Sequence, residues 1–293
     1  MNKTRVDIII PVFNDAEGIS RCLASLDTQS KGGCQLGVIV VDNGSSPPVK
    51  IQKSYAFPVT MIHCDTPGSY AARNAGAAQS EADVLVFLDA DCTPEKDWLI
   101  NGLQAVLAEE GDWVIGGEVI YMLSNDPTAT EAYQCIVGFG QEKNINIRGF
   151  TATANLFVRR ELFLRVGDFD EALLSGGDRE WCWRAERAGA TVGFEKSAIV
   201  STPPRRKLRS AIIQARRIAG GRYTLLSADR RQNLNVKRVL PERSTLQKLK
   251  IIWSGDEFGS VMRLKVLGVA VLLLTVRKLE VVRLKFGGGR ERR

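Results

Sequence analysis

The stretch Ala82-Asp-Val-Leu-Val-Phe-Leu-Asp-Ala-Asp-Cys-Thr-Pro94 joins an apolar run to two carboxylates. The run from Val84 to Leu88 is typical of a strand buried on both faces, as in a parallel sheet. Asp89 and Asp91 follow it, and residues i and i+2 of an extended segment point to the same side. Open α/β sheets bind their ligands at the carboxyl edge of such strands. The stretch therefore predicts an α/β fold in which both carboxylates face one ligand.

Two carboxylates at a strand end suit a hard divalent cation, Mg2+ or Mn2+, whose other ligands include substrate phosphates. A simpler interpretation stays open on these residues alone. Asp89 and Asp91 can be ordinary turn residues that cap a helix opened by Thr93 and Pro94. The other segments of the chain decide between a metal site and ordinary turn residues.

Length and composition indicate a folded globular protein. The 293 residues suffice for one large domain, or for one domain with an extension, and 44% of them are apolar and 25% charged. Six scattered cysteines without a C-x-x-C pair disfavour a zinc site or a disulfide framework and fit a reducing, cytoplasmic setting. We expect no signal peptide, because the sequence passes from Met1-Asn2-Lys3 directly into a strand pattern. The single histidine, His63, excludes multi-histidine metal sites and disfavours Ser-His-Asp chemistry.

Charge divides the chain in two. Residues 1–204 contain 17 Lys and Arg against 27 Asp and Glu, a net charge of −10, whereas residues 205–293 contain 23 against 6, a net charge of +17. A basic tail of this kind usually meets phosphate, on a membrane surface, a nucleic acid or an anionic ligand. We therefore expect an acidic front domain and a basic extension with separate tasks.

The first segments alternate strand and helix. Strands are predicted from Arg5 to Val12 and from Leu36 to Val41, with a helix from Ile19 to Leu26 between them. The second strand ends at Asp42, where a dinucleotide-binding fold places the acid that contacts a ribose. The loop from Phe13 to Gly18 lacks G-x-G-x-x-G, which disfavours a dinucleotide oxidoreductase. Asp42 can still hydrogen-bond a nucleoside, or it can be an Asx-turn residue.

Arg73 lies in a helix otherwise made of small residues, from Ala71 to Ser80. Its planar guanidinium suits a phosphate or an acidic partner such as Asp42 or Asp89, although a solvated surface arginine explains it equally well. Farther along, the polar segment 124–148 resists assignment, and we expect it to be mobile over the site. The segment from Gly149 to Val158 reads as a strand whose small residues leave room for a ligand.

Asp178 follows Gly176-Gly177 at the start of a helix that ends at Gly189. It is either an N-cap or a carboxylate held by a flexible loop at the mouth of a pocket. Trp181 and Trp183 can stack against a sugar ring or can belong to the core.

At this point the chain resembles the family 2 glycosyltransferases, over roughly residues 5–200. That resemblance implies the GT-A nucleotide-diphospho-sugar transferase fold, a Rossmann-like, mostly parallel sheet flanked by helices. It implies a catalytic domain over residues 1–204, and residues 205–293 form a basic helical extension. The segments that carry the resemblance are Ile9-Ile10-Pro11-Val12-Phe13-Asn14, Val41-Asp42-Asn43-Gly44-Ser45, Ala72-Arg73-Asn74-Ala75-Gly76, Leu88-Asp89-Ala90-Asp91, Ala154-Asn155-Leu156-Phe157 with Arg159, and Gly177-Asp178-Arg179-Glu180.

The resemblance also implies roles for individual residues in an inverting single displacement. Asp91 would ligate Mg2+ or Mn2+ on the donor diphosphate, and Asp178 would be the general base for the acceptor hydroxyl. These roles agree with the residues, because a divalent metal stabilises charge on a leaving diphosphate and a partly dry carboxylate can take a proton. The donor nucleotide would contact Pro11, Val12, Phe13, Asn14, Asp42, Arg73, Asp89 and Ala90, and the acceptor and sugar would lie near Asn155, Gly177, Glu180 and Trp181.

The chain departs from the family pattern in three places. Gly177 stands where relatives often have glutamate before the base. No histidine follows the last core strand, where the chain reads Val200-Ser201-Thr202-Pro203, so metal ligation rests more on Asp91. The Gln-x-x-Arg-Trp motif of processive relatives is absent, and we expect transfer of one sugar rather than polymer synthesis.

The basic tail contains two predicted helices. The first runs from Leu208 to Leu226, and Ser254 with Glu257 forms a possible capping box for the second. The apolar stretch from Leu264 to Val276 contains one charge and is shorter than the ~20 residues that span a bilayer. Its flanking cations favour a helix lying in an anionic membrane surface. A helix packed on the catalytic domain, and a full span by snorkelling, stay open.

We therefore expect a cytoplasmic enzyme, peripheral on the inner face of the membrane. Its partners would be a nucleotide-diphosphate sugar donor, a glycan or lipid-linked acceptor of cell-surface polysaccharide or glycolipid assembly, and anionic lipid, with no nucleic acid. A nucleotidyltransferase is disfavoured because the loop after the first strand is acidic. A non-catalytic adaptor would use the tail but leave Asp42, Asp89, Asp91 and Asp178 without purpose.

Overall fold

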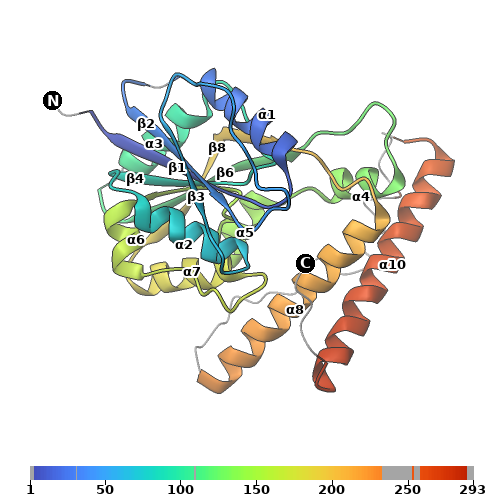
Figure 1. Ribbon diagram of the computed structural model, residues 1–293. Helices are drawn as coiled ribbons and strands as arrows, with labels where there is room; N and C mark the ends of the chain where they lie inside the picture. The colour runs from blue at the N-terminus through green and yellow to red at the C-terminus, as the bar shows by residue number, and fades with distance from the viewer. Residues whose placement is uncertain (1–2, 31, 109, 233–252, 254–257, 289–293) are drawn as a thin grey trace. The chain divides into compact units, whose positions relative to one another are not determined.

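The computed structural model describes residues 3–30, 32–108, 110–232, 253 and 258–288 (Figure 1). These residues fall into two compact units. The first comprises those within 1–119, 141–172 and 177–202, and the second those within 120–140, 173–176 and 203–293. The second unit thus includes two short segments that the sequence places in the catalytic domain.

The first unit is built on a mixed sheet of eight strands in the order β3-β2-β1-β4-β7-β6-β8-β5. The half from β3 to β4 is parallel, whereas β7 runs antiparallel to β4 and β6, and β5 runs antiparallel to β8. The strands are β1 (Arg5–Val12), β2 (Gln35–Asp42), β3 (Val59–His63), β4 (Val84–Leu88), β5 (Thr93–Pro94), β6 (Trp113–Tyr121), β7 (Asn155–Arg159) and β8 (Thr191–Thr202).

Helices lie on both faces of this sheet (Figure 1). Helix α2 packs against β1 and β2, and α3 packs against β7 and β8. Close packing of α2 depends on Gly76, since a Cβ there would lie 2.5 Å from the Ile9 side chain. The helices of this unit are α1 (Ala16–Asp27), α2 (Ser69–Gln79), α3 (Trp98–Ala108), α5 (Gln141–Arg148), α6 (Arg160–Val166) and α7 (Gly177–Arg187).

The organising strand predicted from sequence is confirmed. All five residues of β4 are buried, as its apolar run requires of a central strand. Two details differ from the prediction. Residues 89–91 form a turn, closed by the Cys92 N–H donating to the Asp89 carbonyl at 3.0 Å, and not an extended segment. The strand predicted over 149–158 begins only at Asn155.

The second unit is helical and contains α4 (Ala129–Val137), α8 (Leu208–Gln232) and α10 (Ser260–Lys285). The segment 124–148, expected to be mobile, instead supplies α4 here and α5 to the first unit. A capping box between Thr128 and Glu131 starts α4. Apolar side chains from all three helices form one core: Ala132, Tyr133, Ala211, Ala215, Val266, Val269, Ala270 and Leu273.

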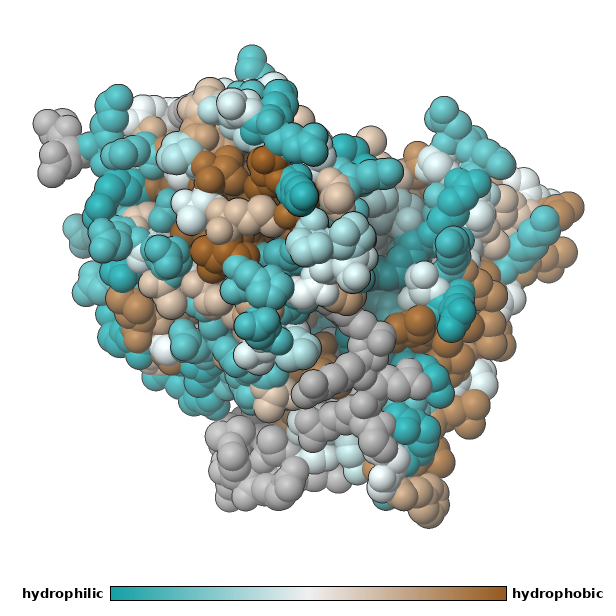
Figure 2. All heavy atoms as spheres, viewed as in Figure 1, coloured by the Kyte–Doolittle hydropathy of each residue, from teal (hydrophilic) through white to brown (hydrophobic). Residues whose placement is uncertain are grey.

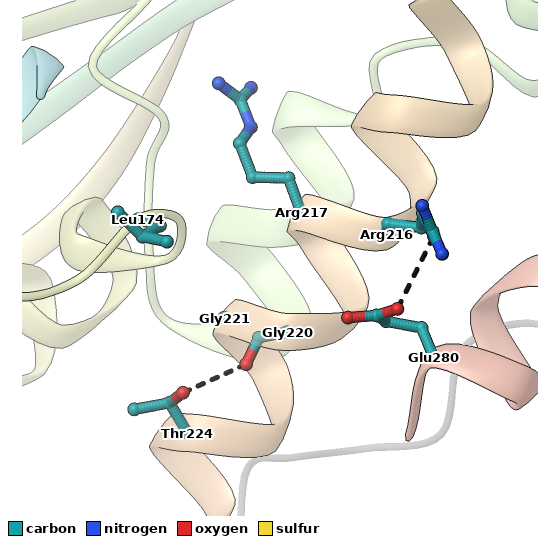
Figure 3. Close-up of a pocket in the computed structure, with 7 residues that line it drawn as sticks. All are labelled: Leu174, Arg216, Arg217, Gly220, Gly221, Thr224 and Glu280. Atoms are coloured by element: carbon teal, nitrogen blue, oxygen red, sulfur yellow. Dashed lines mark hydrogen bonds and ion pairs between the residues drawn. The ribbon is translucent and has the colours of Figure 1, made fainter. Parts of the chain in front are cut away.

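A buried carboxylate fastens α10 to α8. The Glu280 side chain is 2% exposed and lies 3.5 Å from Arg216 of α8 and 2.6 Å from Arg283 of its own helix. Figure 3 shows Arg216 turned toward Glu280, whereas Arg217 points away from it. Glu280 and Arg216 line a small pocket beside Gly220. The pair therefore adds a directed polar contact to an otherwise apolar helix interface.

The end of the chain bears on two predictions. The capping box proposed for Ser254 and Glu257 lies outside the described residues, and α10 begins at Ser260 with Gly259 as its N-cap. Among the described residues, no helix combines the length with the apolarity that crossing a bilayer requires.

Candidate active site

The candidate site lies where three neighbouring parallel strands end. Strands β2, β1 and β4 are adjacent, and Val12 pairs with Asp42 at the last position of β1 and β2. The turn with Asp89 and Asp91 follows β4 at the same edge of the sheet, because parallel strands share their direction. Topology thus gathers the segments on which the donor-site prediction rests.

The loops after β1 and β2 are tied to each other. The Asn14 N–H donates to Ser45 Oγ at 2.8 Å, and the Ser46 N–H donates to Asn14 Oδ1 at 2.8 Å. Asn14 has a φ of 52°, a left-handed conformation that asparagine tolerates better than most residues. Of the remaining predicted residues here, Pro11 is half-buried and Val12 buried, whereas Phe13 is 38% exposed beside them.

Asp42 is buried and holds the loop after β2 together. One carboxylate oxygen accepts the Ser45 N–H at 2.9 Å and the other accepts the Val49 N–H at 3.0 Å. Burial raises the pKa of this carboxyl, but the hydrogen bonds from Ser45 and Val49 outweigh it, and the pKa is lowered overall. Asp42 therefore holds its own loop, as the Asx-turn interpretation implied, but its bonds reach three and seven residues along the chain rather than two.

Asn43 organises the next loop, a role that sequence reasoning did not assign. Its side-chain amide donates to the Cys64 and Thr66 carbonyls at 3.1 and 2.7 Å, and its oxygen accepts the Gly68 N–H at 2.7 Å. The chain entering α2 is thus fixed to the end of β2. The position of Asn43 next to Asp42, in the motif Val41-Asp42-Asn43-Gly44-Ser45, could have indicated this role from sequence.

Arg73 is not a solvated surface residue. It is 4% exposed, and its guanidinium makes an ion pair with the Asp89 carboxylate and a 3.3 Å hydrogen bond to the Ser69 carbonyl. Of the two acidic partners considered from sequence, the structure selects Asp89. The pair brings a cation of α2 to the turn that follows β4.

Asp91 lies two residues beyond Asp89, with the buried Ala90 between them. Burial raises the pKa of the Cys22 thiol, and the charges of Asp91 and Asp89 raise it further, so both carboxylates lie near that thiol. Asp89 and Asp91 remain half-buried and retain contact with solvent.

These two carboxylates fit a cation that a diphosphate would help to hold. Hard divalent ions take oxygen ligands, and Mg2+ is commonly bound by one or two carboxylates with substrate phosphates. Within the described residues, no group of three or more His, Cys, Asp or Glu side chains could hold an ion without such help. Asp91 and Asp89 are the carboxylates at this turn that could contribute oxygen ligands.

Asp178 lies at the second position of α7 and is half-buried. One of its carboxylate oxygens accepts the Arg179 N–H at 2.8 Å and a longer 3.4 Å contact from the Tyr70 hydroxyl. Burial raises its pKa, the charges of Arg179 and Arg73 oppose this, and the charge of Asp89 adds to it. Asp178 is therefore electrostatically coupled to the Arg73–Asp89 pair at the sheet edge.

Three residues predicted on the acceptor side have partners within the protein. Asn155 is fully buried, where its amide accepts from the Trp98 indole and donates to the Glu118 and Ala198 carbonyls. Trp181 is fully buried as well, and Glu180 pairs with Arg184 one turn along α7. This geometry favours support of the site, rather than ligand contact, for these three.

Trp181 occupies the core for a clear reason. Its ring stacks on Phe163 at 5.5 Å between centroids, and its indole N–H donates to the Gly167 carbonyl at 2.7 Å. Trp183 is half-buried and donates to the Arg148 carbonyl at 3.2 Å. The sequence left open whether Trp181 stacks on a sugar ring or belongs to the core, and the structure places it in the core.

Residues 7–165 match the sequence model described as glycosyl transferase family 2. The chain belongs to that family. It is a glycosyltransferase of the GT-A type, as its α/β sheet and its structural neighbours agree. The glycosyltransferase AglE of Haloferax volcanii is 34% identical over 239 residues, which cover 80% of this chain and 77% of AglE.

Two further similarities extend the comparison. This glycosyltransferase is 32% identical to the pre-mycofactocin glycosyltransferase of Mycobacterium tuberculosis over 71% of its own length and 44% of that protein. Its fold resembles the mannosyltransferase PcManGT from Pyrobaculum calidifontis, solved with GDP-Man and Mn2+, with a TM-score of 0.60 and 16% identity. That superposition covers 98% of this chain and 87% of PcManGT.

Proposed function

We propose that this glycosyltransferase moves a sugar from a nucleotide-diphosphate donor to an acceptor hydroxyl with inversion, and that it requires a divalent metal. The observation that carries the proposal is that Tyr70 contacts Asp178 with its hydroxyl and Arg73 with its ring face, while Arg73 pairs with Asp89. The Asp178 carboxylate, whose pKa is raised by burial, is thus linked through Tyr70 to the charged pair at the strand ends. A base and a donor site must lie this close if an acceptor hydroxyl is to attack the donor sugar.

The donor nucleotide would bind across the ends of β1, β2 and β4. The Pro11–Asn14 loop and Asp42 would hold the base and ribose, and Asp89 with Ala90 would reach the ribose or sugar. Arg73 would add positive charge near the phosphates, while its pairing with Asp89 keeps the guanidinium in place. The hydrogen bonds that hold these loops support this, since a preorganised loop needs little further ordering when the donor binds.

Asp91, assisted by Asp89, would hold Mg2+ or Mn2+ together with donor phosphate oxygens. The solved structure of PcManGT contains Mn2+ with GDP-Man, which supports the same use here. When bound, such an ion stabilises the charge that develops on the departing diphosphate. Asp178 would take the proton of the attacking hydroxyl, and attack on the face opposite the leaving group inverts the anomeric carbon.

The test is release of nucleoside diphosphate from a panel of UDP- and GDP-sugars, with and without Mn2+ or Mg2+, beside Asp91→Ala. Turnover of one donor that needs metal and is lost in Asp91→Ala supports the proposal. Asp83→Ala is the matched control, because Asp83 carries the same charge in an exposed ion pair with Arg5. Turnover that persists in Asp91→Ala and in chelator would contradict the metal role.

We propose further that the acceptor is lipid-linked or a cell-surface glycan precursor, and that α10 rests on the cytoplasmic surface of an anionic membrane. None of the six cysteines, all of which lie in the described part of the chain, forms a disulfide, which suits the reducing cytoplasmic side. Helix α10 has one apolar face packed in the helical core and a second one open to solvent. The exposed apolar residues of α10 and its end are Val261, Leu264, Val271, Leu272, Leu279, Val282 and Phe286.

The spacing of that set supports a membrane surface as its partner. Steps of three, four or seven residues keep the side chains on one side of a helix, opposite the buried Val266, Ala270 and Leu273. At about 100° per residue, Lys265 borders one edge of this apolar side and Lys278 the other. Apolar atoms gather over α10 in Figure 2. Apolar side chains bordered by lysine suit an interfacial helix on anionic lipid.

Sedimentation with vesicles of phosphatidylglycerol and phosphatidylcholine tests this proposal. The wild type is expected to pellet with them, and Leu279→Glu to remain in the supernatant. Leu164→Glu is the control, since Leu164 is 56% exposed on α6 and Leu279 is 62% exposed. A wild type that stays soluble, or a lipid-free dimer that Leu279→Glu splits, would show that α10 does not serve the membrane.

A further inference from the structure

Tyr70 connects α2 to the candidate base, although it lies 108 residues away in sequence. Its hydroxyl accepts the Gly177 N–H at 2.9 Å and donates to Asp178 Oδ1 at 3.4 Å. The side chain is buried, and burial raises the pKa of the phenol above its usual value. The phenol therefore keeps its proton at neutral pH and remains a donor toward the carboxylate.

Gly177 and Tyr70 fit each other sterically. A Cβ on Gly177 would lie 2.7 Å from Cε2 of the Tyr70 ring, a distance at which something must shift. The ring thus occupies the space into which a larger residue before Asp178 would project. Any residue larger than glycine before Asp178 would therefore require the Tyr70 ring to move.

The Tyr70 ring also touches the donor side of the site. The Arg73 guanidinium lies over it, 5.6 Å from the ring centroid, and is paired with Asp89. Arg73 and Asp89 are two of the charges that act on Asp178, and Arg179 of α7 is the third. One buried tyrosine therefore contacts the donor-side cation with its face and the base with its hydroxyl.

We propose that Tyr70 is a positioning residue for Asp178, which fixes the start of α7 through Gly177 and orients the carboxylate toward the acceptor hydroxyl. The proposal rests on the proposed role of Asp178 as the base. A hydrogen bond donated to a carboxylate stabilises its ionised form, so the tyrosine also keeps the base deprotonated. Apo contacts of this kind are often long and shorten when substrate binds.

Tyr70→Phe removes the hydroxyl and keeps the ring. With aspartate labelled at the side-chain carboxyl carbon, NMR titration of the protein without substrate follows the Asp178 signal, assigned by its loss in Asp178→Asn. Its pKa is expected to rise further in Tyr70→Phe, because the carboxylate loses a donor. Gly177→Ala is expected to do the same by displacing the ring. An unchanged Asp178 titration in Tyr70→Phe would overturn the proposal.

Kinetics separate positioning from packing. In Tyr70→Phe we expect kcat to fall by about tenfold with a donor KM near the wild-type value, since misplacement of a base lowers the chemical step. The acid limb of the pH profile should move to higher pH. Tyr55→Phe is the control, since Tyr55 stacks on Phe57 in the loop before β3. A lower Tm with an unchanged pH profile would show a packing role only and would overturn the proposal.

The two proposals can fail separately. If Asp178→Asn keeps wild-type turnover of the UDP- or GDP-sugar used, Asp178 is not the base and the proposed function fails at that residue. If Asp178→Asn is inactive while Tyr70→Phe matches the wild type in kcat and in the Asp178 titration, only the role of Tyr70 is wrong.

Discussion

Arg73 and Asp89 form an ion pair at the edge of the sheet, joining the middle of α2 to the turn after β4. The arginine side chain is 5% exposed and the aspartate side chain 39% exposed, so the cation is in the interior and the anion at its surface. The Arg73 Nε is buried without a hydrogen-bond partner among the described residues. Leaving a buried donor unpaired costs about 1–3 kcal/mol.

Arg73→Lys should weaken nucleotide binding. Lysine is a point charge and cannot reproduce a planar guanidinium that serves both Asp89 and a phosphate. We expect the Kd of a nucleoside diphosphate with Mn2+ to rise about tenfold, as expected when one charge-assisted contact is lost. Calorimetry measures it, and Arg5→Lys, in an exposed ion pair with Asp83, should bind normally. Equal Kd values in both variants would show that Arg73 has no donor role.

Asp178→Asn should abolish transfer while it raises stability. Loss of a general base lowers kcat by about 100-fold to 10,000-fold, and donor binding should persist. Burial raises the pKa of this carboxyl above its usual value of 3.8, so the folded state favours the protonated form. The destabilisation is absent below the unfolded pKa and grows as pH rises through the folded pKa. Tm at pH 7 should therefore exceed that of the wild type, and the difference should vanish in acid.

The same pKa shift predicts where activity is lost in acid. Asp178 must be ionised to take a proton, and its pKa is above the usual 3.8. The acid limb of kcat/KM should therefore lie at a higher pH than an ordinary aspartate would give. A pH profile measured at saturating metal shows this. A limb at or below the ordinary value would exclude Asp178 as the titrating group.

Asp42→Ala should destabilise the loop after β2. The substitution leaves the Ser45 and Val49 N–H groups without their acceptor, which costs about 2–4 kcal/mol for two buried donors. Because the Asp42 pKa is lowered, this stabilisation is present above the unfolded pKa and is lost as pH falls through the folded pKa. Urea unfolding at pH 7 measures it. Asp42→Asn keeps one acceptor and should lie between the wild type and Asp42→Ala.

Alanine substitution of two leucines of α10 should have opposite effects on protein stability and on vesicle binding. Leu273 is 3% exposed and packs in the helical core, whereas Leu279 is 62% exposed. Leu273→Ala should cost about 2–5 kcal/mol of unfolding free energy, and Leu279→Ala little. Vesicle binding should instead be weakened more by Leu279→Ala than by Leu273→Ala, at temperatures where both variants are folded. Equal stability losses would mean that the outer side of α10 is covered in solution.

Much of the frame was predictable because its cause is local. A run of buried apolar residues such as Val84–Leu88 predicts a central strand, and the small residues of α2 predict close packing. The order of motifs then placed Asp42, Asp89 and Asp178 in a glycosyltransferase fold, since the first two stand at the ends of apolar strands and the third at the start of a helix. The helices of segment 124–148 were not predicted, because the capping box that starts α4 is a short signal within a polar stretch.

Other features depended on side chains brought together from distant parts of the chain. Sequence could not choose between Asp42 and Asp89 as the partner of Arg73, or see that Tyr70 excludes a side chain from Gly177. It could not show that the Asn155 side-chain amide forms hydrogen bonds with three groups inside the protein. Periodicity reports which face of an element is apolar, because that depends on neighbours a few residues away. Which group meets that face depends on strand order and helix packing, and these are decided only when the whole chain folds.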